Sequence, residues 1–534
     1  MKTHKIAIFL IVLAAMVTGC KAAFNSQNEM SWIFETPADP IQVGVELDSA
    51  KTVEAVIPVE GGTLSVTGAD GTLYTLDIPS DALLNETTIG MTPVSSISNM
   101  PFGNERTYAV QLSPEGLFFQ NFAILTISPA EEIPLAEQIT FGYQGGGKDL
   151  ILAAPVVDSS EIKIQVLHFS GNGVTQGLLA DIEPVRQQLG GDAERRLQNA
   201  VSAELIRIRQ EGGEWVGAAV RAAFEDVFQQ YEEQVVKPRV AAAGESCANG
   251  KLAIQTVYQL ERLRKLVGQG EEGNPLAKYP GLMDKATQVC VIEEFELCVE
   301  DHVIHRMLQI WTDYVRQYAL LGINDNAVLR EARELTVKCL TFKLKFESTG
   351  TLKDVGGGGY ESMVKSEITL RFNPDDFKIS GEAPLVNEEF EFAMPDPCVV
   401  TSVPGGGTFE VFKLGILTAR PGLTSSGPTD ITGWEVGFLL SYMPGNTSES
   451  ASYVCDFAGG GQTKQSLPAF PAWTSAFLAT HSDELDPSSS DIGGFIAIDW
   501  EVFGDEYFAK KEWIKETAEM VEAGTFKLYH TPGQ

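Results

Sequence analysis

The spacing of apolar residues along this chain changes twice, and this change constrains the fold more than any other feature of the sequence. From residue 51 to 178, short runs of β-branched and aromatic residues are separated by Gly, Pro, Asp and Asn, which is typical of strands joined by turns. From 179 to 340, apolar residues recur every three or four positions, as on one face of a helix. The strand pattern returns at 341–534. The sequence therefore predicts a multidomain α+β protein with an N-terminal β-sandwich, a central antiparallel helical bundle and a C-terminal antiparallel β-domain.

The N-terminal strands are expected in nine short segments, and many short strands at this spacing are typical of a sandwich. The segments are 52–57, 62–66, 72–78, 87–92, 107–112, 118–127, 139–143, 150–154 and 162–169. The four residues from Ser170 to Gly173 are expected to form the turn that follows the last strand.

The helical segment contains apolar faces over 197–208 and 216–231, and further helices are expected at 251–267, 283–321 and 327–339. It also contains five arginines among interleaved acidic residues, which favours a solvated helix face over a nucleic-acid surface. These are Arg195, Arg196, Arg207, Arg209 and Arg221.

In the C-terminal part, strands are expected within six segments, and two glycine triplets and one glycine quartet lie between segments of this part. The six segments are 341–346, 367–372, 389–393, 408–417, 433–442 and 495–500. A helix is expected at 506–523, followed by a last strand at 525–530.

The N-terminus predicts export. Lys2 and Lys5 precede an apolar run over 6–17, which is the right length for the hydrophobic region of a signal peptide and too short to span a bilayer permanently. The run ends in Val-Thr-Gly-Cys, and this ending resembles a bacterial lipobox. The resemblance implies cleavage before Cys20 and attachment of lipid to its thiol.

Residues 1–19 are therefore expected to be a lipoprotein signal peptide, and 20–50 a polar tether. The expected location is the exported side of a bacterial cell envelope, with the membrane reached through the acylated Cys20. The chain has 39 Lys plus Arg and 72 Asp plus Glu, a net charge of −33. This charge argues against a nucleic-acid partner, because phosphate binding depends on Lys and Arg.

Seven cysteines become six once Cys20 carries lipid, and an even number in an oxidising compartment predicts disulfides. Cys398 and Cys455 are the two in the C-terminal β-domain and are expected to pair. The other four allow three connectivities, which the sequence leaves open: Cys247, Cys290, Cys298 and Cys339.

Several short motifs between residues 61 and 127 resemble the ZU-five domain, a β-sandwich module of zona-occludens proteins, ankyrins and netrin receptors. The motifs are Gly61-Gly62-Thr63-Leu64, Asp70-Gly71-Thr72-Leu73, Leu76-Asp77-Ile78-Pro79, Asp81-Ala82-Leu83, Thr88-Ile89 and the run from Leu112 to Phe119 followed by 123–127. The chain has Ser80-Asp81 where the family often has a Gly before the Ala-Leu pair, which leaves the conformation of that turn open. The resemblance implies a sandwich over about 51–178 that mediates protein contacts, and it implies no shared ligand.

One motif is close to a phosphate-binding loop. Gly142 and Gly147-Lys148 have the P-loop spacing, but Asp149 stands where that loop needs Ser or Thr. A carboxylate repels phosphate, and the following residues have a strand pattern. A β-hairpin turn is therefore expected here.

Four side chains share one helical stripe and could present ligands to a metal ion: Glu294, Cys298, His302 and His305. The favoured interpretation is that Cys298 is in a disulfide and that the histidines lie at the boundary of the bundle. No metal and no cofactor are therefore expected.

The tripeptide His168-Phe169-Ser170 is a self-cleavage site in some ZU-five proteins, where the Ser hydroxyl attacks the preceding carbonyl. This chemistry needs a base, for which His168 is available, and a strained peptide bond. The favoured interpretation is an intact chain in which Phe169 is a core residue.

The sequence thus favours a lipid-anchored envelope protein without catalytic activity that contacts an unidentified protein or glycan. Two enzymatic alternatives remain. One is a self-processing lipoprotein cut between Phe169 and Ser170. The other is an exported carbohydrate-active hydrolase in the C-terminal half, whose cleft would hold two carboxyls beside Trp434, Trp473 or Trp500.

Overall fold

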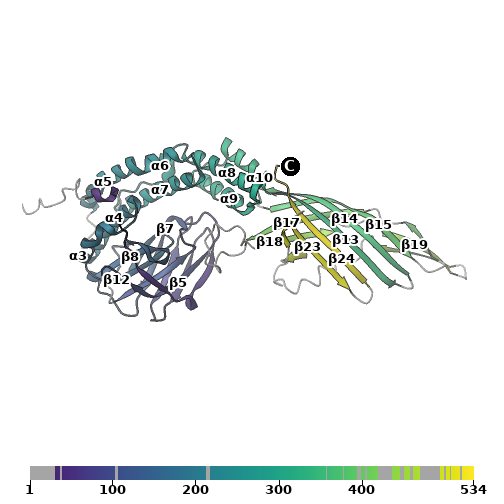
Figure 1. The fold of residues 1–534 in the computed structure, drawn as a ribbon, viewed down its shortest axis with the longest axis horizontal. Helices are drawn as coiled ribbons and strands as arrows, with labels where there is room; N and C mark the ends of the chain where they lie inside the picture. The colour runs from purple at the N-terminus through teal and green to yellow at the C-terminus, as the bar shows by residue number, and fades with distance from the viewer. Residues whose placement is uncertain are drawn as a thin grey trace, which may run out of the picture. The chain divides into compact units, whose positions relative to one another are not determined.

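The computed structural model describes residues 30–35, 39–102, 106–211, 217–355, 358–376, 378–393, 398–402, 406–418, 436–444, 450–457, 461–468, 494–497, 501–504, 507–516 and 520–533. The protein is a mixed α+β fold with several antiparallel sheets (Figure 1). It divides into two compact units, one formed by residues up to 290 with 312–324, the other by 291–311 with 325–534.

The first unit contains two sheets. Seven strands form the larger sheet: β1 (Gly44–Leu47), β2 (Val53–Ile57), β5 (Thr87–Ser98), β6 (Thr107–Ser113), β8 (Gln138–Gln144), β9 (Lys148–Leu152) and β12 (Gly171–Gln176). Five strands form the smaller sheet in the order β10 (Ala154–Pro155), β11 (Ile162–His168), β7 (Phe118–Ser128), β4 (Leu73–Ile78) and β3 (Gly62–Thr67).

The two sheets share one hydrophobic core because each strand buries alternate side chains. On β3, Leu64 and Val66 are buried while Ser65 and Thr67 are exposed. Both sheets contribute to the cluster, which includes Leu76, Ile89, Val110, Leu125, Ile164 and Phe169. Burial of each such side chain stabilises the fold by about 1.5 to 3 kcal/mol, so this core holds the sheets together.

The turn where the chain departs from the ZU-five pattern is left-handed. Asp81 has a φ of +57°, a conformation that glycine adopts without steric cost. Asp is among the residues that tolerate this region, so the turn keeps the conformation of a glycine turn without the glycine.

The other face of the larger sheet is covered by helix α4 (Ala193–Gln210) (Figure 1). The side chain of Asp192 caps the helix by accepting a hydrogen bond from the backbone N of Arg195. A second apolar cluster fills this layer, with Phe141, Tyr143 and Leu152 from the sheet and Ile206 from the helix.

The structure corrects the expectation of a solvated arginine face on α4. Arg209 is 3 % exposed and donates hydrogen bonds to Gln138 Oε1 and to the backbone oxygens of Val156, Ser159 and Glu161. Arg196 is equally buried and donates to the backbone oxygen of Trp32. Acidic residues between the arginines do not show which of the arginines are exposed. The guanidinium groups of Arg196 and Arg209 connect α4 to Trp32 and to the loop between β10 and β11.

Part of the expected tether is folded. Trp32 and Ile33 of the short helix η1 (Ser31–Phe34) are buried, and β1 pairs with β5. The backbone N of Val43 donates to the oxygen of Gly147. The apolar residues of this segment are few and show no sustained period, so the sequence pattern missed these elements.

The segment expected as a turn at Ser170–Gly173 is also different. Residues 171–176 form β12, which pairs with β6 on one side and β8 on the other. A Cβ at Gly171 would lie 1.9 Å from the ring of Tyr143, so the glycine is required by close packing inside a sheet. Glycine spacing alone does not distinguish this role from a turn.

Besides η1 and α4, ten helical elements of four or more residues lie in the described ranges. They are α3 (Leu179–Ile182), η5 (Glu183–Gln188), α5 (Gly217–Tyr231), η6 (Glu232–Val236), α6 (Lys237–Ala242), α7 (Cys247–Leu266), η7 (Pro275–Lys278), α8 (Leu282–Asp301), α9 (Ile304–Leu320) and α10 (Ala327–Cys339). Residues of α8 and α9 belong to both units. The single helix expected at 283–321 is interrupted at His302, which has a φ of +57°. No helix in the described ranges is long and apolar enough to span a membrane.

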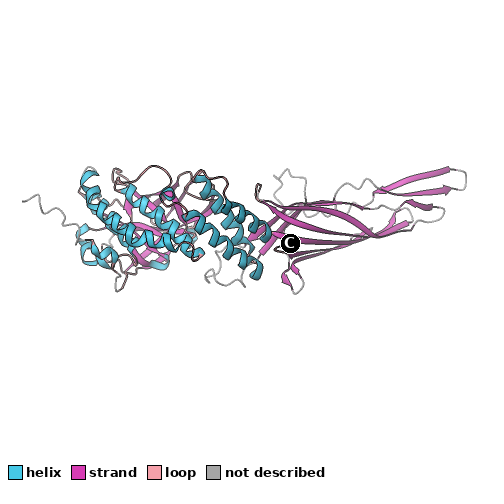
Figure 2. Ribbon diagram, turned by 90° about the horizontal axis from the view of Figure 1, so that it is seen from above, coloured by secondary structure: helices cyan, strands magenta, loops and turns pink. Residues whose placement is uncertain are grey.

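The second unit contains a nine-stranded antiparallel sheet with long strands (Figure 2). Its order is β21 (Gly494–Ala497), β18 (Val436–Pro444), β17 (Gly406–Thr418), β15 (Lys378–Ala393), β14 (Gly358–Asn373), β13 (Thr341–Val355), β24 (Met520–His530), β23 (Tyr507–Glu516) and β22 (Glu501–Gly504). A smaller sheet contains β16 (Cys398–Ser402), β19 (Ser450–Phe457) and β20 (Gly461–Pro468).

The helix expected at 506–523 is wrong, because β23 and the first residues of β24 occupy this stretch. Phe526 and Leu528 of β24 are buried opposite Phe346 and Leu344 of β13. The Lys- and Glu-rich composition favours a helix locally, but pairing along a long apolar strand overrides that propensity.

Candidate functional site

A polar cavity of about 230 Å³ lies within the first unit, between strand β7, the loop before β5 and the helices α7, η7 and α9. Most of its lining residues carry amide, carboxylate, hydroxyl or cationic groups. They are Asp81, Gln120, Asn121, Tyr258, Glu261, Arg262, Lys265, Gly273, Asn274, Pro275 and Leu320.

Arg262 of α7 lines this cavity and links the helix to the smaller sheet. Its Nη1 donates to the backbone oxygen of Phe119 at 2.6 Å, and its Nη2 donates to Gln259 Oε1 at 3.0 Å. The guanidinium lies 4.1 Å from the ring centroid of Phe118, a cation–π contact. Burial lowers the pKa of Arg262 to about 9, so the group remains charged at neutral pH.

Both carboxylates of the cavity are held in ion pairs. Asp81 Oδ1 lies 2.5 Å from Arg316 Nη2, and Glu261 Oε2 lies 3.0 Å from Lys278 Nζ. Glu261 Oε1 also accepts a hydrogen bond from the backbone N of Glu271 at 2.6 Å. These contacts fix the carboxylates as acceptors.

Gln120 is the least satisfied polar group of the cavity. The residue is 8 % exposed, and its Oε1 has no hydrogen-bond partner among the described residues. Rotation of the amide turns either its oxygen or its NH₂ toward the cavity, so it can accept from or donate to a bound group. A buried polar group without a partner costs about 1 to 3 kcal/mol, and a ligand would recover this energy.

Sequence reasoning missed this cavity. Its residues come from positions as distant as Asp81 and Leu320, and the only local signal is a pair of adjacent amides, Gln120-Asn121, inside an otherwise apolar strand.

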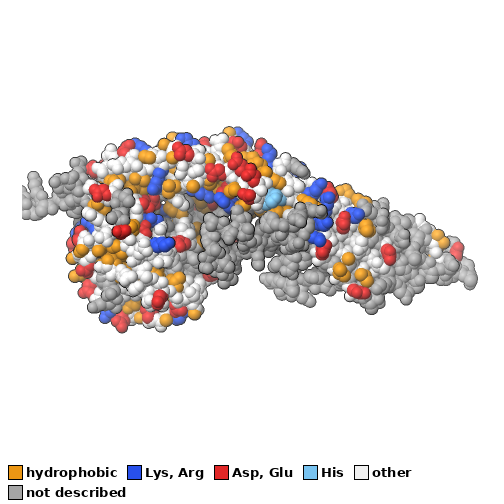
Figure 3. All heavy atoms as spheres, viewed as in Figure 1, with side chains coloured by type: hydrophobic (Ala, Val, Ile, Leu, Met, Phe, Trp, Pro, Cys, Tyr) orange, Lys and Arg blue, Asp and Glu red, His pale blue; other side chains and the backbone are white. Residues whose placement is uncertain are grey.

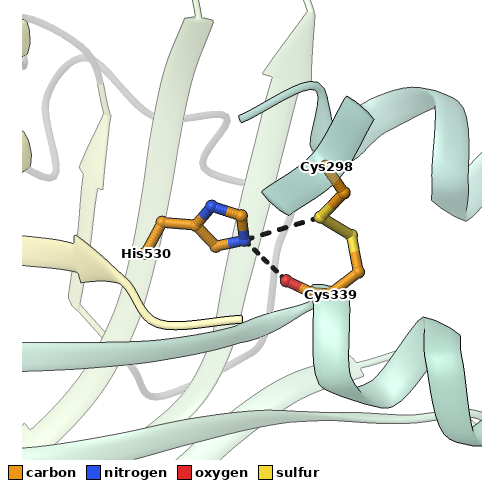
Figure 4. Close-up of side chains that lie close together, drawn as sticks. All are labelled: Cys298, Cys339 and His530. Atoms are coloured by element: carbon orange, nitrogen blue, oxygen red, sulfur yellow. Dashed lines mark hydrogen bonds between the residues drawn. A yellow bond between two sulfur atoms is a disulfide. The ribbon is translucent and has the colours of Figure 1, made fainter. Parts of the chain in front are cut away.

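In the second unit, His530 lies next to the disulfide between Cys298 and Cys339 (Figure 4), and a second histidine, His302, contacts it. Nδ1 of His302 is 2.7 Å from Nδ1 of His530, the last residue of β24. Nε2 of His530 is 2.6 Å from the backbone oxygen of Cys339 and 3.7 Å from Sγ of Cys298.

These contacts determine where the protons lie. A carbonyl oxygen only accepts, so Nε2 of His530 carries a hydrogen and donates to Cys339. Nδ1 of neutral His530 is then an acceptor, and Nδ1 of His302 donates to it. Burial, with a smaller contribution from His302, lowers the pKa of His530 to about 4, although its hydrogen bond to Cys339 opposes the shift. At neutral pH, His530 is therefore uncharged and hydrogen-bonded to both His302 and the backbone oxygen of Cys339.

The structure does not assemble the alternative metal set on one helical stripe, and Cys298 is in a disulfide, as the favoured interpretation predicted. Cys298 is bonded to Cys339, Glu294 Oε1 pairs with Arg306 at 2.5 Å, and His302 contacts His530. The side chain of His305 lies outside the described residues. In the described ranges, the only three metal-ligand side chains within 4.8 Å of one another are Cys298, Cys339 and His530.

The cysteines form three disulfides. Cys398 pairs with Cys455, the pair expected from the sequence, and these residues are also register partners in β16 and β19. The connectivity that the sequence left open is Cys247–Cys290 and Cys298–Cys339.

The Phe169-Ser170 peptide is fixed by backbone hydrogen bonds. Phe169 N donates to Leu117 O at 3.0 Å, and Phe169 O accepts from Gly116 N at 3.0 Å. Ser170 O accepts from Leu112 N at 3.1 Å. Neither Phe169 nor Ser170 has a positive φ. The side chain of His168 lies outside the described residues, so a base for Ser170 is not placed.

The loop with P-loop spacing is a hairpin, as expected. Strands β8 and β9 pair antiparallel on either side of the short helix η4 (Gly145–Gly147). Asp149 pairs with Arg195 of α4 at 2.8 Å, so its carboxylate serves the contact between sheet and helix.

Four further sequence predictions fall on residues that the structure does not describe. They concern the lipid attachment residue Cys20 and the aromatic residues Trp434, Trp473 and Trp500.

Comparison with known proteins adds no family. No model of a known protein family matches the sequence. No curated protein matches it either. The resemblance to the ZU-five domain therefore stays a prediction from the motifs themselves.

Proposed function

We propose that this chain is a lipid-anchored, non-catalytic protein of the bacterial cell envelope that binds a glycan through the polar cavity at Gln120. In this proposal, an N-terminal ZU-five-like β-sandwich, a central helical bundle and a C-terminal β-domain form the exported part. Lipid on Cys20 holds that part at the membrane.

The cavity carries this proposal. Its amides, carboxylates and Tyr258 are groups that exchange hydrogen bonds with sugar hydroxyls, because a hydroxyl both donates and accepts. Gln120 offers a buried amide oxygen that lacks a hydrogen-bond partner among the described residues. At about 230 Å³ the cavity is smaller than the 300 to 1,000 Å³ of pockets for drug-sized ligands, which suits one sugar ring.

The ion pairs favour binding over hydrolysis. A glycoside hydrolase needs one carboxyl to give a proton and a second to attack the sugar or activate water. Asp81 and Glu261 instead accept from Arg316 and Lys278. Acidic and basic side chains are interspersed over the helices on the face in Figure 3, which suits a neutral ligand better than a nucleic acid.

Titration with N-acetylglucosamine, followed by saturation-transfer NMR, tests the proposal. We expect the wild type to bind and Gln120→Leu to lose binding at least tenfold, with unchanged or higher thermal stability because an unsatisfied buried amide is removed. Gln111→Leu, on β6 and outside the cavity, is the matched control and should bind as the wild type does. Equal binding by wild type and Gln120→Leu, or no binding by the wild type, would contradict the proposal.

A further inference from the structure

The cluster of Cys298, Cys339 and His530 has the composition of a zinc site. The disulfide joins the last turn of α8 to the last residue of α10, and both cysteines are fully buried. His530 enters from β24, so three segments distant in sequence converge here (Figure 4). Two thiolates and an imidazole are ligands that Zn²⁺ prefers.

One distance already matches a metal-bound geometry. With Zn–S of about 2.3 Å and Zn–N of about 2.05 Å, two ligand atoms of a tetrahedral zinc are about 3.6 Å apart. Sγ of Cys298 and Nε2 of His530 are 3.7 Å apart. The two sulfurs are covalently bonded in the disulfide and would lie about 3.8 Å apart as two zinc ligands.

A change of tautomer in the histidine pair can free Nε2 of His530 to bind a metal ion. Nε2 of His530 now carries a proton for the oxygen of Cys339. If that proton moves to Nδ1 of His530 and the Nδ1 proton of His302 moves to its own Nε2, Nδ1 of His302 at 2.7 Å can accept the new hydrogen bond. Metal-bound histidines usually donate their other N–H in this way, which makes His302 a positioning residue.

We propose that reduction of the Cys298–Cys339 disulfide converts this cluster into a Zn²⁺ site. A dithiol reductant supplies two electrons and two protons, is itself oxidised to a disulfide, and leaves two Cys thiols. Zn²⁺ displaces both thiol protons and binds the two sulfurs and Nε2 of His530, with water in the fourth position. The site is independent of the glycan cavity, so either proposal can fail alone.

Cobalt provides the direct test, because Co²⁺ bound to thiolates shows charge-transfer bands and tetrahedral d–d bands. The full chain is treated with a phosphine reductant, the reduced thiols are mapped by alkylation and mass spectrometry, and Co²⁺ is added before and after Zn²⁺. We expect thiolate bands in the reduced protein only, with loss of the bands when Zn²⁺ displaces Co²⁺.

Variants separate this site from the other cysteines. The bands should persist in Cys247→Ser/Cys290→Ser and vanish in Cys298→Ser/Cys339→Ser. His530→Gln keeps an N–H donor for Cys339 and should weaken Co²⁺ binding at least tenfold. His302→Asn should weaken it about tenfold and retain the tetrahedral bands, as expected for an outer-shell partner.

Circular dichroism of each reduced, metal-free variant shows whether it remains folded. Absence of thiolate bands in the reduced wild type would overturn the proposal. So would unchanged binding by a folded His530→Gln variant, or a Cys298–Cys339 bond that the reductant does not open in the folded chain.

Discussion

Asn85, in the loop before β5, donates a hydrogen bond from its side-chain Nδ2 to Oδ1 of Asp313 on α9. The two residues are 228 positions apart in the chain and belong to the same unit. Burial raises the pKa of Asp313 to about 6, although the charge of Lys251 and the bond from Asn85 oppose the shift. At neutral pH the ionised carboxylate of Asp313 is therefore held in a buried environment that disfavours its charge.

Asp313→Asn should stabilise the protein at pH 7. The folded state binds a proton at Asp313 between pH 6 and about 4 where the unfolded state does not, so this group favours folding as the pH falls through that range. Asn keeps an acceptor for Asn85 and carries no charge, so we expect a gain of about 1 to 3 kcal/mol at pH 7 that shrinks toward pH 4. Urea unfolding of both proteins at several pH values measures this, and a variant less stable than the wild type at pH 7 would contradict it.

Arg209→Met should destabilise the first unit strongly. The substitution removes the donors for Gln138 and for the backbone oxygens of Val156, Ser159 and Glu161, with an expected loss of about 2 to 4 kcal/mol. Arg207→Met on the same helix is the matched control. Its partners Glu204 and Glu211 form i,i+3 and i,i+4 surface pairs, so the loss should stay below about 1 kcal/mol. Equal losses in denaturant unfolding would refute the buried role of Arg209.

Gly171→Ala tests the position of β12 inside the sheet. The new methyl group would collide with the ring of Tyr143, and we expect a loss of about 1 to 3 kcal/mol or more. Gly244→Ala is the control, because its nearest neighbour would be 3.8 Å away in ordinary contact. If thermal melting shows no difference between the two variants, Gly171 lies in an open turn and the observed strand is wrong.

The sequence predicted elements well where one local signal decides them. The helix expected at 327–339 matches α10 because Asn326 caps it, its side chain accepting from the backbone N of Leu329. The break at His302 was missed because the apolar period continues across it. The interruption follows from long-range contacts, among them the bond between His302 and His530.

The candidate sites were harder to foresee, because they depend on segments that meet only in the fold. Of the four residues considered as possible metal ligands, Cys298 alone lies in the observed cluster, and its partner His530 is 232 positions away. Helical spacing reports neighbours on one helix and contains no information about such partners.

Cys20→Ser tests the anchor. Each methylene buried in the bilayer contributes about 0.8 kcal/mol, so acyl chains on Cys20 would supply most of the membrane affinity. We expect the variant to move from the membrane fraction to the soluble fraction of lysed cells. A variant that stays with the membrane would place the anchor elsewhere.

The proposed function requires an exported, lipid-bearing chain that stays in one piece, and intact mass spectrometry of the protein purified from membranes tests this requirement. We predict one polypeptide that carries lipid on Cys20 and is continuous across Phe169-Ser170, with six cysteines in disulfides. Two fragments, one ending at Phe169 and one beginning at Ser170, which disappear in Ser170→Ala, would show that the protein processes itself. That result, or an unmodified Cys20, would contradict the account.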